Sequence, residues 1–266
     1  MKNIVIAAGY ATRLYPLTEN FPKPLLEIGS SSILGRMIED IDSIEDIDEH
    51  IIVSNHKFAR HFEEWAEKQD TRCPITIIDD GTETNETRLG AVKDLLLAID
   101  YIETTNSHSP SSSPSSSSSP SSSPTSKVPD ILVVAADNIL DFSFQGFVDF
   151  FKEKCTSIIM CHHEPEQKRL QRTGVIKVDE NMKVLLMQEK PENPVSNWAV
   201  PPFYIYSRND IPLIKDCMNH GCGFDAPGNL AHYLAEVTTL HAWQMPGKRF
   251  DIGTLDTYYE AKEIFK

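Results

Sequence analysis

Short apolar runs that alternate with helix-length segments constrain the fold of this chain most strongly. Strand-length runs occur at residues 3–7, 51–53, 75–78 and 131–135, and each of the first three precedes a segment with helical periodicity. A strand, a helix and a second strand form the βαβ pattern, which builds a parallel sheet. The run ILVVAA is apolar throughout, as in a central strand covered by helices on both faces. The sequence therefore predicts an α/β sandwich.

Other segments extend this pattern along the chain. In the first predicted helix, one face collects the apolar side chains of Ile33, Leu34, Met37, Ile38 and Ile41. Further helices are predicted at about 57–68, 88–103, 208–219 and 255–265. The segments TGVIKVD, VLLMQEK and PPFYIYS read as strands of a smaller antiparallel or mixed part.

Residues 105–127 are almost entirely serine and proline. Such a segment cannot bury enough apolar surface to offset the entropy lost on ordering, so it predicts a disordered surface loop. Loop-closure entropy grows slowly with length, and one fold can carry the insertion. We therefore expect a single domain over residues 1–266, interrupted by this insert at about 105–128.

The overall charge excludes some partners. The chain has 266 residues, a formal net charge of -14 and a pI near 5.0, which disfavours nonspecific binding to nucleic acid or to an anionic membrane. No stretch is long enough to span a membrane, and the N-terminus lacks the features of a signal peptide. An odd number of cysteines, five, favours reduced thiols. These features predict a cytoplasmic protein.

The loop after the first predicted strand carries the first sign of function. A strand that runs into a glycine loop at Gly9 leaves backbone N–H groups available for phosphate oxygens. Arg13 can bind phosphate with its guanidinium fork, and Lys23 offers a point charge between two prolines. The loop is neither a Walker loop nor a dinucleotide fingerprint. The two cations favour an anionic substrate.

These residues belong to a larger pattern that resembles the sugar-phosphate nucleotidyltransferases, the family that includes glucose-1-phosphate thymidylyltransferase. The matching segments follow the family's order: GYATRL with PKPL, AADN, TGV, QEKP and FDIGT. They cover almost the whole chain apart from the serine-rich insert. The resemblance implies a Rossmann-like three-layer α/β/α sandwich with a mixed, mostly parallel central sheet, the nucleotide-diphospho-sugar transferase type.

The resemblance also implies a reaction. An oxygen of a sugar 1-phosphate attacks the α-phosphate of a nucleoside triphosphate, which yields a nucleotide sugar and pyrophosphate. Arg13 and Lys23 match the catalytic cations that steady the phosphates. Asp137 and Asp251 match the two carboxylates that hold Mg²⁺, an ion that prefers hard oxygen ligands. Since family members are often dimers or tetramers, a homo-oligomer is also implied.

The nucleotide-binding residues implied by the family are Ala8 and Gly9 in the loop, with Leu89 and Gly90 as the nearest match to its base-reading segment. Thr87 and Arg88 are further candidates for contacts with the base. The base stays open, with a pyrimidine favoured by family analogy. The family usually has a second glycine where this chain has Ala11, a change that is tolerable if φ at this residue is negative.

The sugar phosphate is assigned in the same way. The family pattern places Lys190 on the sugar phosphate and Glu189 on the sugar hydroxyls, while Gly174 lets the backbone approach the sugar. Asn197 is expected to border the same site together with Trp198. No residue pattern identifies the sugar.

Two other functions fit the same motifs. The first is a cytidylyltransferase that acts on phosphocholine or a similar phosphorylated small molecule. The second is a noncatalytic nucleotide-sugar sensor that keeps the fold and has lost the reaction. The presence of all four charged residues, Arg13, Lys23, Asp137 and Asp251, argues against the sensor.

Overall fold

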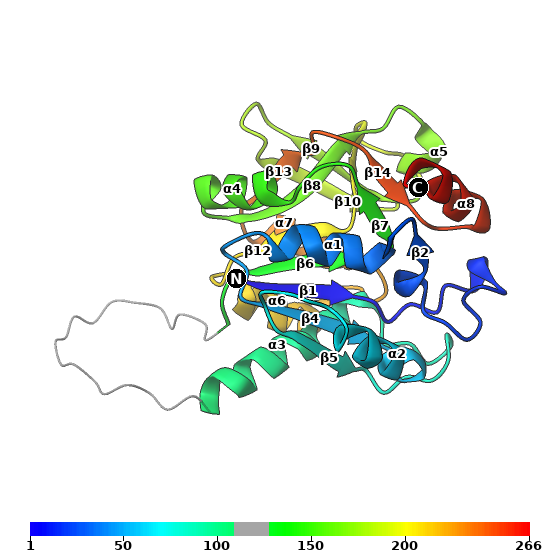
Figure 1. Ribbon diagram of the computed structural model, residues 1–266. Coiled ribbons are helices and arrows are strands. Elements are labelled where there is room, and N and C mark those ends of the chain that lie inside the picture. Colours follow the sequence, from blue (N-terminus) through cyan, green and yellow to red (C-terminus); the bar gives the residue numbers. More distant parts are fainter. Residues whose placement is uncertain (109–127) are drawn as a thin grey trace.

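The computed structural model describes residues 1–108 and 128–266. Within them, ten strands form one mixed sheet that is the middle layer of the molecule (Figure 1). The sheet order is β10-β9-β11-β8-β12-β6-β1-β4-β5, and β13 pairs with β8. The bounds are β1 Lys2–Ile6, β4 Glu49–Ser54, β5 Ile75–Asp79, β6 Ile131–Ala135, β8 Ser157–His163, β9 Gly174–Val178, β10 Val184–Glu189, β11 Trp198–Val200, β12 Phe203–Tyr206 and β13 Leu240–Gln244.

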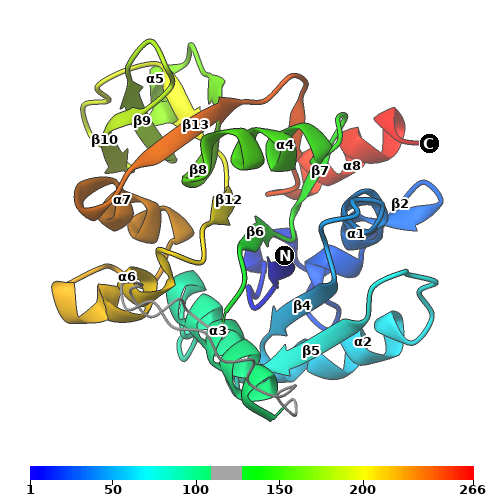
Figure 2. The same ribbon diagram turned by 90° about the vertical axis from the view of Figure 1, so that its left-hand side faces the viewer.

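Helices cover both faces of the sheet and complete three layers (Figure 2). One face carries α3 (Ala91–His108), α6 (Ile211–Asp216) and α7 (Pro227–Val237). The other face carries α1 (Ile33–Asp42), α2 (His56–Ala66) and α4 (Gln145–Lys154). The predicted α/β/α sandwich is therefore confirmed.

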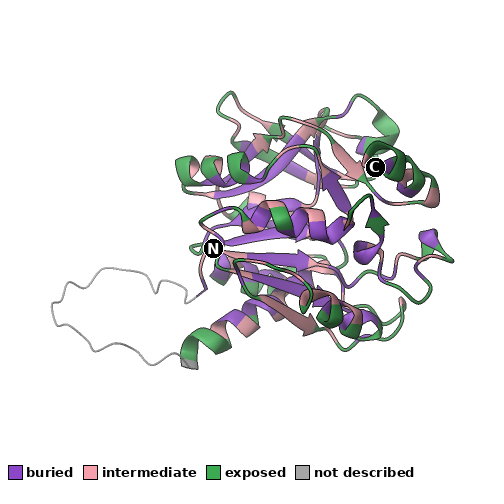
Figure 3. Ribbon diagram, viewed as in Figure 1, coloured by how far each residue is buried: buried purple, intermediate pink, exposed green. Residues whose placement is uncertain are grey.

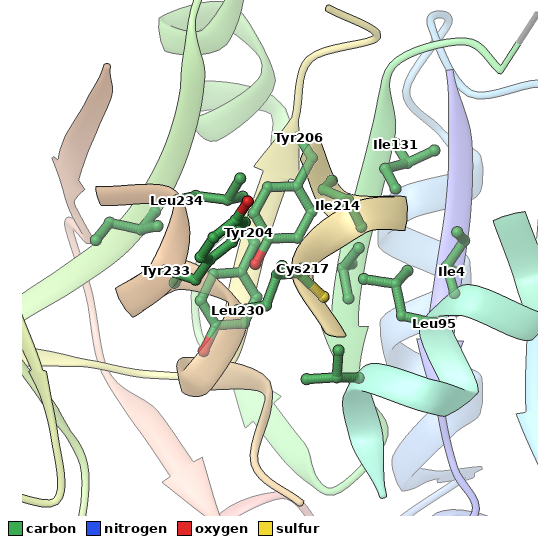
Figure 4. Close-up of a cluster of buried hydrophobic side chains, with 14 of the residues drawn as sticks. Ile4, Leu95, Ile131, Tyr204, Tyr206, Ile214, Cys217, Leu230, Tyr233 and Leu234 are labelled. Atoms are coloured by element: carbon green, nitrogen blue, oxygen red, sulfur yellow. The ribbon is translucent and has the colours of Figure 1, made fainter. Parts of the chain in front are cut away.

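Side chains of the central strands alternate between the two faces, as the period of a strand requires. Ile4 of β1 packs against the α3 side, whereas the next residue, Val5, packs against the α1 side. Figure 4 shows the cluster on the α3 side, in which the stacked rings of Tyr204 and Tyr206 lie toward one end and Ile4 and Leu95 toward the other. The strands are accordingly buried through the middle of the molecule (Figure 3).

The strand directions divide the sheet into two parts. β1 pairs in parallel with β4 and β6, and β4 pairs in parallel with β5. β12 is antiparallel to both β6 and β8. The sequence placed PPFYIYS in a smaller part, but its strand, β12, lies at the centre of the main sheet. All four residues of β12 are buried, as expected for a central strand that helices cover on both faces.

Two short ribbons and a last helix hold the N-terminal loop in place. β7 (Asn138–Leu140) pairs with β14 (Arg249–Asp251), and β2 (Glu27–Ile28) pairs with β3 (Ser31–Ser32). The helix α8 (Leu255–Ile264) contributes Tyr258 and Ala261 to a small buried cluster with residues of this loop. Residues more than 200 positions apart thus fix one loop.

Some elements differ from the prediction. No helix was predicted from the sequence at α4 or α7, nor was the single turn α5 (Gln167–Leu170). The predicted insert began at residue 105, but α3 continues to His108, and the hydroxyl of Thr105 donates to the Tyr101 carbonyl at 3.1 Å. The rest of the predicted disordered insert, residues 109–127, lies outside the described residues. None of the helices in the described ranges is long and apolar enough to cross a membrane.

Candidate active site

A cleft of about 350 Å³ opens beyond the carboxyl ends of β1 and β6. Ligands of open α/β sheets bind at this edge. Six residues of the sequence-based site line the cleft: Ala8, Gly9, Arg13, Lys23, Gly90 and Asp137. Six others do not line it and are described below: Leu89, Gly174, Glu189, Lys190, Asn197 and Asp251.

The loop that follows β1 presents free backbone donors to this cleft. Within the described residues, the backbone N–H groups from Gly9 to Arg13 donate no hydrogen bond to the protein. The loop is nevertheless held firmly, because buried Asn55 donates its side-chain amide to the Ala8 carbonyl at 3.0 Å. The buried Thr18 hydroxyl donates to the Ala11 carbonyl at 2.8 Å. Such a fixed array of N–H groups binds anions.

Ala11 adopts a conformation that the sequence did not predict. Its φ is 47° and its ψ is 41°, in the left-handed region that favours glycine. We expected alanine to be tolerable here if its φ were negative. Its φ is positive, so this expectation is wrong. The hydrogen bonds from Leu14 N and Thr18 Oγ1 to the Ala11 carbonyl hold the residue in this conformation.

Arg13 lies in the 3₁₀ turn Thr12–Leu14 that follows Ala11. Its side chain is exposed, and in the described part of the chain it has no hydrogen-bond or ion-pair partner. A guanidinium without a protein partner at the rim of an anion-binding loop is available to phosphate oxygens.

Lys23 is held at the floor of the cleft. Its ammonium group donates to Oδ2 of Asp137 at 2.7 Å and to the Ile252 carbonyl at 3.0 Å. Burial would raise the pKa of the Asp137 carboxyl, but the charge and hydrogen bond of Lys23, helped by the charge of Arg249, hold that pKa below its ordinary value. Asp137 is therefore ionised at neutral pH and positions Lys23.

The fold brings Asp251 next to Asp137 although 114 positions separate them in the chain. Asp251 of β14 pairs with Asn138 of β7, and the following N–H, of Ile252, donates to the Asp137 carbonyl at 3.0 Å. The Asp251 carboxylate is 54% exposed, and within the described residues its one ion pair is with Arg249, at 3.9 Å. The backbones of the two aspartates are therefore neighbours, and carboxylate oxygens are the kind of ligand that Mg²⁺ prefers.

A second wall of the cleft comes from the start of α3. Gly90 has a φ of 94°, and a Cβ there would lie 2.5 Å from the Phe224 carbonyl oxygen, so this position requires glycine. Arg88 forms an exposed ion pair with Asp225 at 2.9 Å across this contact. Leu89 is half-buried and does not line the cleft. Thr87 faces its own turn, where its hydroxyl donates to the Thr84 carbonyl at 3.1 Å.

Sequence reasoning missed one acid at this wall, Asp94, and a second acid near it, Asp80. Asp94 lines the cleft, and burial, with the charge of nearby Asp80, raises its pKa to about 7. Burial also raises the pKa of Asp80. The available signal was the helical spacing, since Asp94 is four residues before buried Ala98 and so lies on the buried face of α3.

Gly174 and Glu189 meet at the end of the β9–β10 pair, outside the cleft lining. A Cβ at Gly228, the second residue of α7, would lie 1.9 Å from Oε2 of Glu189. Glycine at this position therefore admits the carboxylate to the helix N-terminus, where the helix dipole favours negative charge. Burial raises the pKa of Glu189, and the charges of Lys190 and His232 offset this only in part.

The other two predicted sugar-side residues are placed differently. Lys190 follows β10, and its exposed ammonium lies 3.8 Å from Oε1 of Glu189. Asn197 precedes β11, whose Val200 pairs with Gly174. Three residues of strand separate Asn197 from that pair, roughly 10 Å, so the structure does not bring it to Gly174 and Glu189. Trp198 packs edge-on against His163.

Comparisons with known proteins agree with this geometry. A family model described as "Nucleotidyl transferase" matches residues 2–266. A glucose-1-phosphate adenylyltransferase of Fervidobacterium nodosum is 24% identical over 98% of this chain and 60% of its own length. A glucose-1-phosphate adenylyltransferase of Acetivibrio thermocellus is 22% identical over 97% of this chain and 58% of its own length. The chain thus spans about three fifths of these curated relatives.

The fold matches solved structures over its whole length. The structure of a UDP-glucose pyrophosphorylase complexed with UDP-glucose superposes with a TM-score of 0.76 at 20% identity. The match covers 99% of this chain and 97% of that structure. At this identity the likeness establishes the fold.

Proposed function

We propose that this chain, which belongs to the nucleotidyl transferase family, transfers a nucleoside monophosphate from a nucleoside triphosphate to a sugar 1-phosphate. The products are a nucleotide sugar and pyrophosphate. The observation that carries the proposal is the loop from Gly9 to Arg13, which lines a cleft together with Lys23 and Asp137 and whose N–H groups have no partner in the described residues.

The reaction joins two anions, so positioning and charge neutralisation are the main tasks of the protein. A phosphate oxygen of the sugar 1-phosphate forms a bond to the α-phosphorus. The bond from the α-phosphorus to the bridging oxygen breaks, and its electron pair leaves with pyrophosphate. We assign the loop amides and Arg13 to the triphosphate and the departing pyrophosphate. Lys23 neutralises charge near the reacting phosphorus.

Asp137 and Asp251 are the residues that would hold Mg²⁺. When bound, this ion supplies positive charge to phosphate oxygens. Asp137 then has two tasks, because the same carboxylate holds the Lys23 ammonium at 2.7 Å. Removal of its charge would both weaken metal binding and release Lys23.

We place the sugar near Glu189 and Lys190, beyond the cleft that holds the nucleotide. Glu189 is 14% exposed and is kept there by its contact with α7, so it can accept hydrogen bonds from sugar hydroxyls. Exposed Lys190 can meet the phosphate of the same substrate. All five cysteines are free, which accords with the cytoplasmic setting that we expect.

A substrate grid tests the proposal. Pyrophosphate release would be measured with Mg²⁺ for each common nucleoside triphosphate against several sugar 1-phosphates and phosphocholine. We expect turnover with at least one sugar 1-phosphate and none with phosphocholine. Turnover with phosphocholine alone would replace the proposal by the cytidylyltransferase, and nucleotide binding without turnover on any acceptor would favour the sensor.

A further inference from the structure

One buried acid in the cleft has no part in the transfer chemistry. Asp94 lies in the first turn of α3, lines the cleft and is only 3% exposed. No group in the described part of the chain donates a hydrogen bond to it, and its Oδ1 is fully buried. Buried polar atoms almost always have partners, so this carboxyl group is prepared for donors that a ligand supplies.

Asp80 supports the same view from the neighbouring strand. Its Oδ1 accepts hydrogen bonds from the N–H and the hydroxyl of Thr82, both at 2.7 Å. Its Oδ2 is buried without a partner. Asp80 does not itself line the cleft, whereas Asp94 does and accepts no hydrogen bond from the described residues.

These acids lie away from the phosphate-binding end of the cleft. Asp137 follows β6 and Asp80 follows β5, and the strand order β6-β1-β4-β5 separates them by three strand spacings, roughly 14 Å. Phosphates would be repelled by Asp80 and Asp94 and are attracted to Arg13 and Lys23. With the phosphates at those cations, we place the base, the group farthest from the phosphates, toward Asp94, which lines the same cleft.

The acids select a base by its donors. Guanine presents two neighbouring donors on its Watson–Crick edge, N1–H and the N2 amino group, which together match the two oxygens of one carboxylate. Adenine and cytosine each place a ring-nitrogen acceptor beside their amino group. Uracil and thymine place carbonyls on both sides of their single N–H. A carboxylate therefore meets two donors side by side only in guanine.

We infer that Asp94 reads the nucleobase by accepting both donors of guanine, so that GTP is the nucleotide substrate. This inference rests on the proposed nucleotidyl transfer and departs from the pyrimidine that family analogy favours. Asp80 supports it by excluding bases that turn carbonyl oxygens toward this wall.

Nucleotide binding measured by calorimetry tests the inference without any turnover. We expect GTP to bind more tightly than ATP, CTP, UTP and dTTP. ITP, which lacks the N2 amino group, should bind about 10- to 100-fold more weakly than GTP, the usual effect of a lost base-specific contact. This comparison needs no variant and so does not depend on a mutant that folds.

The variant Asp94→Asn sharpens the test, because asparagine replaces one acceptor by an amide donor. XTP carries a carbonyl oxygen in place of the N2 amino group and complements this amide. We expect Asp94→Asn to lower the affinity for GTP by about 10- to 100-fold and to raise the affinity for XTP. The matched control Asp100→Asn, an exposed position farther along α3, should leave the affinity for both nucleotides unchanged.

Two results would overturn the inference. The first is a wild-type protein that binds another nucleotide more tightly than GTP. The second is an equal loss of affinity for every nucleotide in the Asp94→Asn variant, which would indicate that Asp94 contacts the ribose. Turnover with UTP or ATP but not GTP would refute guanine while the proposed function stands. No turnover with any acceptor, together with a change of preference from GTP to XTP in Asp94→Asn, would refute the reaction and support the base assignment.

Discussion

Lys23 and Asp137 depend on each other, since each is a charge that the other neutralises at 2.7 Å. We expect Lys23→Ala and Asp137→Asn each to lower turnover by on the order of a hundredfold, the usual effect of removing a group that stabilises developing charge. Both residues line an open cleft, so the circular dichroism spectrum should keep its folded shape. The measurement is kcat with saturating substrates.

Asp149→Asn is the control for this pair, because Asp149 is exposed on α4, far from the cleft lining. Its kcat should equal that of the wild type. Near wild-type kcat in either Lys23→Ala or Asp137→Asn would contradict the site.

Asp94 predicts a cost in stability that depends on pH. Its pKa is about 7 in the fold and near 3.8 in the unfolded chain, so the folded protein binds the extra proton between these values. Stability is therefore lost as pH rises from about 4 to about 7. Asp94→Asn removes this loss, and its gain in unfolding free energy should be larger at pH 8 than at pH 5 by on the order of 3 kcal/mol.

Urea denaturation at the two pH values measures this difference, with Asp100→Asn as the control. An equal gain at both pH values would show that Asp94 is not held in its protonated form. If Asp94→Asn raises the unfolding free energy and also lowers the affinity for GTP, Asp94 is a group retained for function at the expense of stability.

At the level of elements, a buried polar cluster joins β1, β4 and the end of α1. The ring of His50 lies 3.0 Å from the Asn3 amide and 3.0 Å from the Asp42 carboxylate. The backbone N–H groups of Arg72 and Cys73 also donate to Asp42. These hydrogen bonds hold the ends of three elements together.

This cluster predicts acid sensitivity. Burial lowers the pKa of His50, so the unfolded chain takes up a proton below about pH 6.5 that the folded chain resists. Burial would raise the pKa of Asp42, but its hydrogen bonds hold it at about 2, against 3.8 in the unfolded chain. Stability should therefore fall as pH drops below about 6.5, and again between about 4 and 2.

His50→Gln isolates the first of these steps, and urea denaturation at pH 7.5 and 5.5 measures it. The unfolding free energy of the variant should depend less on pH over this interval. His56 is a matched control of opposite sign, because its hydrogen bond to Asp79 raises its pKa. An unchanged pH dependence in His50→Gln would show that His50 titrates alike in both states.

The elements also show what the sequence could and could not predict. The parallel strands were predicted because their apolar runs are continuous. The helix α7 was missed because it begins with Pro227 and Gly228, residues that usually mark a loop although proline is well suited to a first helical turn. The central position of β12 depends on its pairing with β6 and β8, which no local pattern contains.

The same limit applies to the site. Three of its charged residues, Arg13, Lys23 and Asp137, could be proposed from the sequence because they stand in ordered motifs. Asp94 was not, since an acid in the first turn of a helix is ordinarily a solvated residue that favours the helix dipole. The helical spacing to Ala98 was the one signal in the sequence, and the burial of this side chain in the fold separates it from that role.

At the scale of the whole molecule, the serine- and proline-rich segment, residues 109–127, lies outside the described residues. Its composition cannot support a packed core. We expect a short Gly-Ser linker in place of residues 109–127 to leave kcat and the melting temperature nearly unchanged. Loss of soluble protein or of turnover would show that this segment is structural.

The molecule as a whole brings the loop from Gly9 to Arg13, Lys23 and two aspartates that are 114 positions apart in the chain, Asp137 and Asp251, to one edge of the sheet. The most direct test is the stoichiometry of the reaction with Mg²⁺, GTP and a mixture of sugar 1-phosphates, followed by mass spectrometry. We predict that pyrophosphate and a nucleotide sugar appear in equal amounts, and only when all three components are present. Pyrophosphate without an acceptor, or no product with any nucleoside triphosphate, would contradict nucleotidyl transfer to a sugar.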